Sequence, residues 1–270
     1  MPSSWSDLDR PPLSAARLRV VTGPPSVWTR VDVVERTAST NADVVAAAEA
    51  GEPAGYVLVA EQQDAGRGRL DRVWESPPRA GLLMSVLVRP EVPPTALPLL
   101  PLLAGVAVAE AVRSIGDVPA RLKWPNDVLA GDRKLGGLLV ERTTNGGVVV
   151  GIGLNVSTRA AELPVDTATS LAIEGGHTDR EPLAKEILRA LGRRYAGYVD
   201  ANGSPDSVLP AYREVCETIG RQVVVQLPGG ESVAGTAVAV DDSGMLIVRG
   251  PDGSEQAWSA GDVIHVRTES

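Results

Sequence analysis

The pattern of apolar residues changes after Gly220, and this change divides the chain into two structural units. Beyond that residue, short β-branched runs alternate with turn sequences such as Asp241-Asp242-Ser243-Gly244 and Pro251-Asp252-Gly253. Short strands with a turn about every ten residues are typical of a small all-β unit. We therefore predict a small β-barrel over residues 220–270, preceded by a larger domain that ends near residue 219.

Residues 29–219 combine strand and helix patterns, which predicts a globular domain containing both. Strand patterns lie at residues 31–34, 57–61, 82–88, 121–124, 134–142 and 147–156, and helix patterns lie at about 41–50, 95–115, 182–199 and 205–219. Thr40, with Asp43 three residues later, resembles a capping box at the start of the first helix. Residues 1–28 are rich in Pro, Ser and Arg and predict a tail with one short ordered piece.

Charge and composition exclude several classes of protein. The 270 residues carry a formal net charge of −8, whereas a nucleic-acid binder usually presents a basic face. The longest apolar stretch, 97–109, contains two prolines and is shorter than the ~20 residues that span a bilayer, so we predict a buried core helix. Cys216 is the only cysteine, which excludes an internal disulfide. We expect a cytoplasmic protein with no membrane or nucleic-acid partner.

Polar and basic residues gather in a few segments, of which two lie early in the chain. Ser39-Thr40-Asn41 begins a predicted helix, where side-chain oxygens and free N–H groups are available to a ligand. The same residues are also favoured helix caps. The loop 62–72 contains Gly66, Gly68 and three arginines, a composition that allows close backbone approach and bidentate binding of phosphate or carboxylate. A solvated basic loop is the alternative.

Asn145-Gly146 predicts a hairpin between the strands at 134–142 and 147–156, and three more polar or glycine-containing segments lie before it or within its strands. Lys123-Trp124-Pro125-Asn126-Asp127 presents a lysine, an amide and a carboxylate where a strand stops, and the carboxylate is a hard ligand suited to Mg²⁺. Lys134-Leu135-Gly136-Gly137 follows, and a decorated hairpin is the alternative for both. In Gly151-Ile152-Gly153-Leu154-Asn155 the two glycines indicate close backbone approach within a strand.

The residue patterns that several common binding sites and catalytic mechanisms require are absent from this sequence. The glycine spacing of a dinucleotide-binding fold and the Walker pattern are both absent, so any nucleotide cradle is of another kind. The only histidines, His177 and His265, do not accompany a serine–glycine elbow, so a hydrolase triad is not expected. With one cysteine and two histidines, a metal site built on those residues cannot be assembled.

Taken together and in this order, these segments resemble the biotin–protein ligase family, and the resemblance covers about residues 30–268. The matching motifs are Ser39-Thr40-Asn41, Gln63 with Gly66-Arg67-Gly68-Arg69, Lys123 to Asp127, Lys134 to Gly137, Gly151-x-Gly153-x-Asn155 and Ala168-Thr169-Ser170-Leu171. The resemblance implies an α+β fold. Its catalytic domain has a mixed sheet with helices, of the class II aminoacyl-tRNA-synthetase and biotin-ligase type, and is followed by an SH3-like β-barrel. The chain is similar to family members that lack an N-terminal DNA-binding domain.

The resemblance also implies a two-step reaction. Biotin and MgATP form biotinyl-5′-AMP and pyrophosphate, and the biotinyl group then passes to one lysine of a biotin carboxyl carrier protein domain of an acyl-CoA or pyruvate carboxylase. Adenylation brings anions together, so its site needs cations and a metal ion, here Mg²⁺.

Residue roles follow from the same resemblance. Lys134 would bridge the biotin carboxylate and the α-phosphate, and Arg69 would act with it in catalysis. The implied biotin-binding residues are Ser39, Thr40, Asn41, Gln63, Arg67, Gly68, Arg69, Lys134 and Gly137. The implied ATP-binding residues are Arg69, Arg72, Trp74, Lys123, Asn126, Lys134 and Asn155, and Asp127 would hold the metal.

One position departs from the family pattern, which commonly has glycine where this chain has Asp71. A carboxylate beside the arginines can pair with one of them, which bears on loop closure and adenylate retention. Three other functions remain open: a lipoate–protein ligase, a biotin-responsive DNA-binding repressor and a non-catalytic binding domain. Lipoate lacks the ureido ring that the polar groups of Ser39 and Gln63 would serve.

Overall fold

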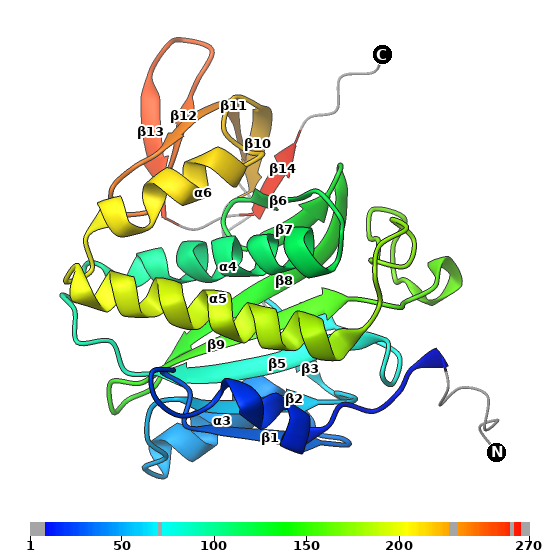
Figure 1. The fold of residues 1–270 in the computed structure, drawn as a ribbon. Coiled ribbons are helices and arrows are strands. Elements are labelled where there is room, and N and C mark those ends of the chain that lie inside the picture. The colour runs from blue at the N-terminus through cyan, green and yellow to red at the C-terminus, as the bar shows by residue number, and fades with distance from the viewer. Residues whose placement is uncertain (1–8, 70–71, 227–231, 260–261, 266–270) are drawn as a thin grey trace.

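The computed structural model describes residues 9–69, 72–226, 232–259 and 262–265. Its larger part is built on a seven-stranded mixed sheet (Figure 1). In spatial order the strands are β1 (Arg30–Val34), β2 (Tyr56–Ala60), β5 (Gly81–Val88), β9 (Val148–Asn155), β8 (Arg133–Arg142), β7 (Asp127–Ala130) and β6 (Ala120–Lys123). Only β1 and β2 pair in parallel. The mixed sheet with helices is therefore confirmed.

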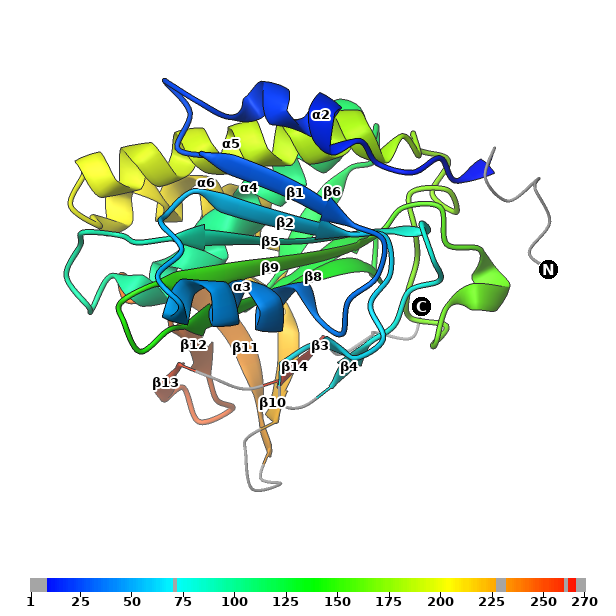
Figure 2. The ribbon, with the colours of Figure 1, turned by 90° about the horizontal axis from the view of Figure 1, so that it is seen from below.

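Helices cover both faces of this sheet, but unequally (Figure 2). On one face lie α4 (Leu100–Ile115), which follows a 3-10 turn η2 (Leu97–Leu99), and α5 (Arg180–Asp200). The segment Leu97–Ile115 is long and apolar enough to cross a membrane, yet 67% of it is buried inside the protein. It is thus the predicted core helix. The opposite face carries α3 (Thr40–Glu49), which leaves part of the sheet open to other segments.

The described part of the N-terminal segment packs on the body of the protein. It contains α2 (Ala15–Leu18) and a 3-10 turn η1 (Arg19–Val21). Leu18 and Trp28 are buried, and the Trp28 indole N–H donates to the carbonyl of Leu188 on α5. The short ordered piece expected in this segment is therefore present, and apolar side chains spaced among its prolines reach the core.

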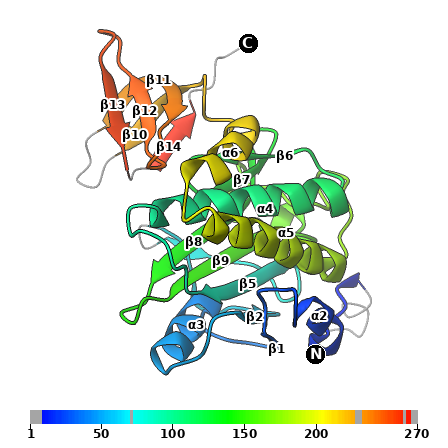
Figure 3. The same ribbon diagram turned by 60° about the vertical axis from the view of Figure 1, so that its left-hand side comes forward.

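The C-terminal residues form a five-stranded antiparallel sheet (Figure 3). In spatial order its strands are β13 (Glu255–Trp258), β12 (Leu246–Arg249), β11 (Ser232–Val240), β10 (Gln222–Gln226) and β14 (Asp262–His265). Within the described residues no pairing joins β13 to β14, so the sheet does not close into the predicted barrel. The predicted boundary near 219 falls between α6 (Leu209–Val215) and β10.

Two local predictions differ from the structure. The helix predicted over 205–219 is shorter: a 3-10 turn η4 (Pro205–Ser207) precedes α6, and Cys216 instead bridges to Leu122 of the sheet. Strand β7 was not predicted, because a proline such as Pro125 usually ends a strand. Pro125 instead lies in a tight turn, and the register pairs Lys123 directly with Asp127.

Candidate functional site

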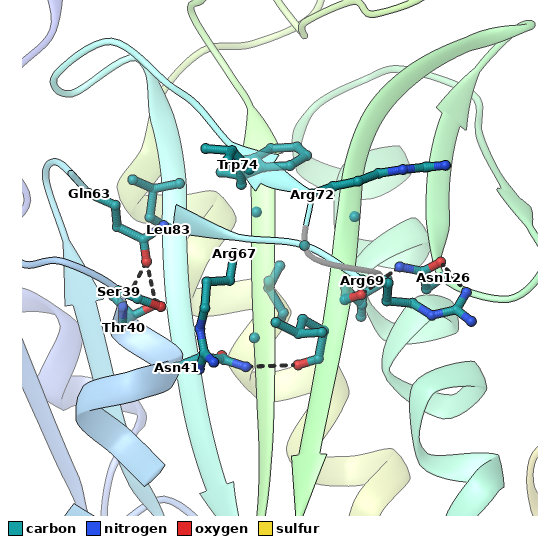
Figure 4. A pocket seen from close by; sticks show the side chains of 18 of the residues that line it. Ser39, Thr40, Asn41, Gln63, Arg67, Arg69, Arg72, Trp74, Leu83 and Asn126 are labelled. Carbon is teal, nitrogen blue, oxygen red and sulfur yellow. Dashed lines mark hydrogen bonds between the residues drawn. The ribbon is translucent and has the colours of Figure 1, made fainter. Parts of the chain in front are cut away.

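The predicted polar segments converge on the sheet face that α3 only partly covers. A cavity of about 130 Å³ opens there, under the hairpin of β3 (Gly66–Arg67) and β4 (Val73–Trp74) (Figure 4). Its lining residues are Ser39, Thr40, Asn41, Gln63, Arg67, Gly68, Arg69, Arg72, Val73, Trp74, Leu83, Asn126, Asp127, Lys134, Gly137, Leu138, Leu139, Gly151, Ile152 and Gly153.

One end of this cavity is formed by the start of α3. Ser39, not Thr40, is the N-cap, because its hydroxyl accepts the N–H of Ala42, while Asp43 pairs with the Thr37 hydroxyl. Thr40 thereby gains another role, since both its N–H and its hydroxyl donate to Oε1 of Gln63, at 2.7 and 2.9 Å (Figure 4). These contacts fix the amide of Gln63 at the wall of the cavity.

Asn41 lines the cavity, but its side-chain amide forms hydrogen bonds with other groups of the protein. Its Oδ1 accepts the hydroxyl of buried Ser85 at 2.6 Å. Its Nδ2 donates to Glu141 Oε2 at 2.8 Å and to the carbonyl of Leu139 at 3.2 Å. Gly151 makes room for this amide, because a Cβ there would lie 2.1 Å from Asn41 Oδ1. The predicted close backbone approach at Gly151 thus serves a protein side chain.

The arginine-rich loop, taken as its described residues 62–69, crosses the cavity and contacts the neighbouring strands. Arg67 Nη2 lies 3.0 Å from Glu141 Oε2 on β8, and Arg69 Nη1 donates to Asn126 Oδ1 at 3.2 Å (Figure 4). Asn126 is itself anchored, since its Nδ2 donates to the carbonyl of Leu138 at 2.7 Å. Both arginines therefore lie over the site. Asp71 lies outside the described residues.

Trp74 of the hairpin stands over β9. A Cβ on Gly153 would lie only 2.7 Å from the indole Cε2, so this strand position must be glycine for the ring to lie there. The ammonium of Lys134 is 5.9 Å from the centre of the ring, within cation–π range. The second glycine of the motif therefore accommodates an aromatic side chain.

Lys134 is held at the centre of the site. Its Nζ lies 2.6 Å from Asp127 Oδ1, and its backbone exchanges hydrogen bonds with Thr167 and Thr169. Asn155 supports the same segment, because its Nδ2 donates to the carbonyl of Thr169 at 2.9 Å. The side chain of Lys134 remains 37% exposed, which leaves the ammonium available to a ligand.

A second cavity of about 770 Å³ adjoins the first and shares Arg72, Val73, Trp74, Asp127 and Lys134 with it. Its other lining residues are Glu75, Lys123, Leu129, Asp132, Asn155, Pro164, Val165, Thr167, Ala168, Arg221, Val263, Ile264 and His265. Across the two cavities, basic side chains outnumber acidic ones although the whole chain carries a net charge of −8. Such a setting suits a polyanionic ligand.

Arg221 and His265 were not among the predicted site residues. Both come from the C-terminal region, far from the motifs in sequence, so no local pattern marked them. Burial and the nearby charges of Lys123 and Arg221 lower the pKa of His265 to about 4. The neutral ring is consistent with its Nε2 lying 3.1 Å from the hydroxyl of Thr218.

Every residue predicted for the site lines one of the two cavities, and those that line both lie where they meet. The cavities bring the residues together but do not assign ligands to them. Among the described residues, no group of three Asp, Glu, His or Cys side chains could hold a metal ion. A single carboxylate, Asp127, is compatible with Mg²⁺, which commonly takes one or two carboxylates together with substrate phosphates.

The chain is similar to proteins of known activity along nearly its whole length. The description "Biotin/lipoate A/B protein ligase family" matches residues 33–157, and "Biotin protein ligase C terminal domain" matches residues 218–266. The chain is 42% identical over 264 residues to the biotin--[acetyl-CoA-carboxylase] ligase of Mycobacterium tuberculosis, which covers 96% of this chain and 97% of that one.

Two solved structures resemble the fold. The biotin protein ligase from Aquifex aeolicus in complex with biotin and ATP superposes with a TM-score of 0.73 at 28% identity, covering 89% of this chain and 100% of that one. The biotin protein ligase from Leishmania major in complex with biotinyl-5-AMP gives a TM-score of 0.60 at 27% identity, covering 88% and 100%.

Proposed function

This chain belongs to the biotin/lipoate A/B protein ligase family, and on that premise we propose that it uses ATP to attach biotin to a lysine of an acceptor protein. The observation that carries the proposal is the position of Lys134, whose ammonium lies where the two cavities join. One cavity has the polar groups to hold a small acid, and the other has the charge to hold a triphosphate.

The smaller cavity suits biotin. The ureido group has N–H donors and a carbonyl acceptor, and Ser39, Thr40 and Gln63 offer both kinds of partner in fixed positions. Leu83 and Ile152 provide apolar surface for the rest of the molecule. Lipoate has no ureido group, so it would gain nothing from the polar groups of Ser39, Thr40 and Gln63 at this end of the cavity. We therefore favour biotin over lipoate.

The larger cavity suits ATP. Trp74 offers an aromatic face for adenine, and Asn155 lies within reach of the ribose or a phosphate. Lys123 and Arg72 face the outer phosphates. Mg²⁺ would bind to Asp127 and the phosphates, and would supply charge neutralisation.

Lys134 acts where charge concentrates during adenylation. The biotin carboxylate attacks the α-phosphorus, pyrophosphate leaves, and the ammonium donates hydrogen bonds to both reacting groups. Its ion pair with Asp127 directs the ammonium into the site before the substrates bind. Arg67 and Arg69 then cover the mixed anhydride and exclude water, which would hydrolyse it.

The second step needs an acceptor amine at the same place. We propose that a lysine of a biotin carrier domain enters beside the hairpin and attacks the acyl carbon, releasing AMP. The name of the Mycobacterium tuberculosis relative points to acetyl-CoA carboxylase as the source of that domain. Carrier domains of pyruvate carboxylase are a further candidate acceptor.

Intact-mass measurement of a carrier domain incubated with the protein, biotin and MgATP tests the proposal. We expect a gain of one biotinyl group. Lys134→Ala should lower the rate ~10²–10³-fold, as removal of other donors to developing charge does. Lys185→Ala is the matched control, because Lys185 pairs with Glu181 on α5, away from both cavities. A domain that gains nothing with biotin, or that gains a lipoyl group when lipoate replaces biotin, would refute the proposal.

A further inference from the structure

Glu141 lies beside the site but belongs to none of the predicted motifs. One of its oxygens, Oε2, receives two hydrogen bonds, from Arg67 Nη2 at 3.0 Å and from Asn41 Nδ2 at 2.8 Å. The side chain is 27% exposed and that of Arg67 is 47% exposed, so this pair remains in contact with solvent. Glu141 thus connects the arginine-rich loop to the sheet without lining the smaller cavity.

The loop has little apolar packing at this point. A third cavity of about 520 Å³ adjoins the smaller one between this loop and β8, and its lining includes Arg67, Gly68, Leu139 and Glu141. Val73, the apolar residue of the hairpin nearest this space, is 68% exposed. Polar contacts therefore hold much of the loop against β8 here, and the Arg67–Glu141 ion pair is one of them.

The hydrogen bonds that hold Glu141 continue through Asn41 to the other end of the site. Asn41 is 4% exposed and receives the hydroxyl of fully buried Ser85. The Ser85 hydroxyl also lies 2.8 Å from that of Thr40, which in turn contacts Gln63. One buried network thus orients both the polar end of the cavity and the carboxylate that receives the loop.

We propose that Glu141 is a positioning residue that holds the arginine-rich loop closed through Arg67, and so sets how long the acyl-adenylate stays in the site. This inference rests on the function proposed above. Without the carboxylate, the loop opens more often and the adenylate escapes sooner, while the groups that form it remain in place.

Glu141→Gln tests this role with little change of shape, since the amide oxygen can still accept from Asn41. The adenylate is formed with labelled biotin and MgATP, separated from free ligand, and its release from the protein is followed over time. We expect release about two- to fivefold faster, the range for a partly exposed ion pair. Wild-type release should also speed up with added salt, because salt screens the pair, and the variant should lose this response.

Glu52→Gln is the matched control, because Glu52 is similarly exposed at 22%, pairs with Arg30 at 3.2 Å and lines neither cavity. We expect it to release the adenylate at the wild-type rate and to retain its salt response. If wild type and Glu141→Gln release equally, or respond equally to salt, the role of Glu141 is refuted while the ligase function stands. If the wild type forms no adenylate, the proposed function fails and this inference with it.

Discussion

Gly153→Ala is a small change that should displace Trp74, which lines both cavities. The added Cβ would lie 2.7 Å from Cε2 and 3.0 Å from Nε1 of Trp74, far inside ordinary contact. The backbone of β9 is fixed in the centre of the sheet between β5 and β8. Trp74 stands on a hairpin with only two residues in each strand, so the indole is the group that moves.

The size of the effect follows from this geometry. Restoring a contact of 3.4–4 Å displaces the ring by about 0.7–1.3 Å. Overpacking of this kind costs about 1–3 kcal/mol of folding free energy, and the short strands of the hairpin favour the lower end of that range. A displacement of about 1 Å in a positioning group can cost ~10²-fold in rate. We therefore expect kcat/KM for ATP to fall about 10- to 100-fold with the fold intact.

Pyrophosphate release at saturating biotin, measured against ATP concentration, gives the kinetic effect. Calorimetry with biotin alone should show a smaller change than the ATP kinetics, because Ser39, Thr40 and Gln63 stay in place even though Gly153 and Trp74 also line the smaller cavity. A double-mutant cycle with Trp74→Ala tests whether the effect acts through Trp74, since removal of the ring also removes the clash. The double variant should then resemble Trp74→Ala alone.

Gly197→Ala is the matched control, because no atom lies within 4 Å of a Cβ at that helix position. It should leave the kinetics unchanged and stabilise the fold by about 0.5–1 kcal/mol. Wild-type ATP kinetics in Gly153→Ala, or fully additive effects in the cycle, would refute the proposed contact between Trp74 and the nucleotide.

Two further predictions concern stability. Glu61 and Arg180 form a buried ion pair at 2.6 Å, with side chains 5% and 4% exposed, so Glu61→Gln should lower the free energy of unfolding in urea by about 3–5 kcal/mol; a loss below 1 kcal/mol would contradict this. The folded-state pKa of His265 is lowered to about 4, below its ordinary value of 6.5, so the unfolded chain takes up a proton first as the pH falls. The free energy of unfolding should therefore decrease as the pH falls from about 6.5 to 4, and it should decrease less in His265→Asn. Equal pH dependence in the two proteins would show that this histidine does not contribute.

Much of the secondary structure could be predicted because its signals are local. The apolar run of α4 and the apolar face of α5 indicate helices whatever the fold around them. Asn145-Gly146 indicates the hairpin between β8 and β9. Strand β7 escaped because the proline before it stops a strand in most contexts. Here the turn around Pro125 returns the chain at once, and only its pairing with β6 and β8 shows that the sheet continues.

The residues predicted for the site do line the two cavities, but several of their contacts could not be predicted from the sequence. Asn41 was predicted to face a ligand, yet its amide contacts Ser85 and Glu141. Neither partner is near it in sequence, so no spacing rule links them. Likewise, Gly153 indicated a close approach without indicating that Trp74 was the group approaching.

The chemical groups that the protein carries can be read from its sequence, and most strands, helices and glycine-rich turns can be predicted from it, because they depend on neighbouring residues. Tertiary structure alone decided which groups meet. The order β5-β9-β8-β7 brings Gly153, Lys134 and Asp127 side by side, and the C-terminal sheet adds His265. Strand order and register are set by packing of the whole core, so a contact such as that of Arg67 with Glu141 appears only once the chain has folded.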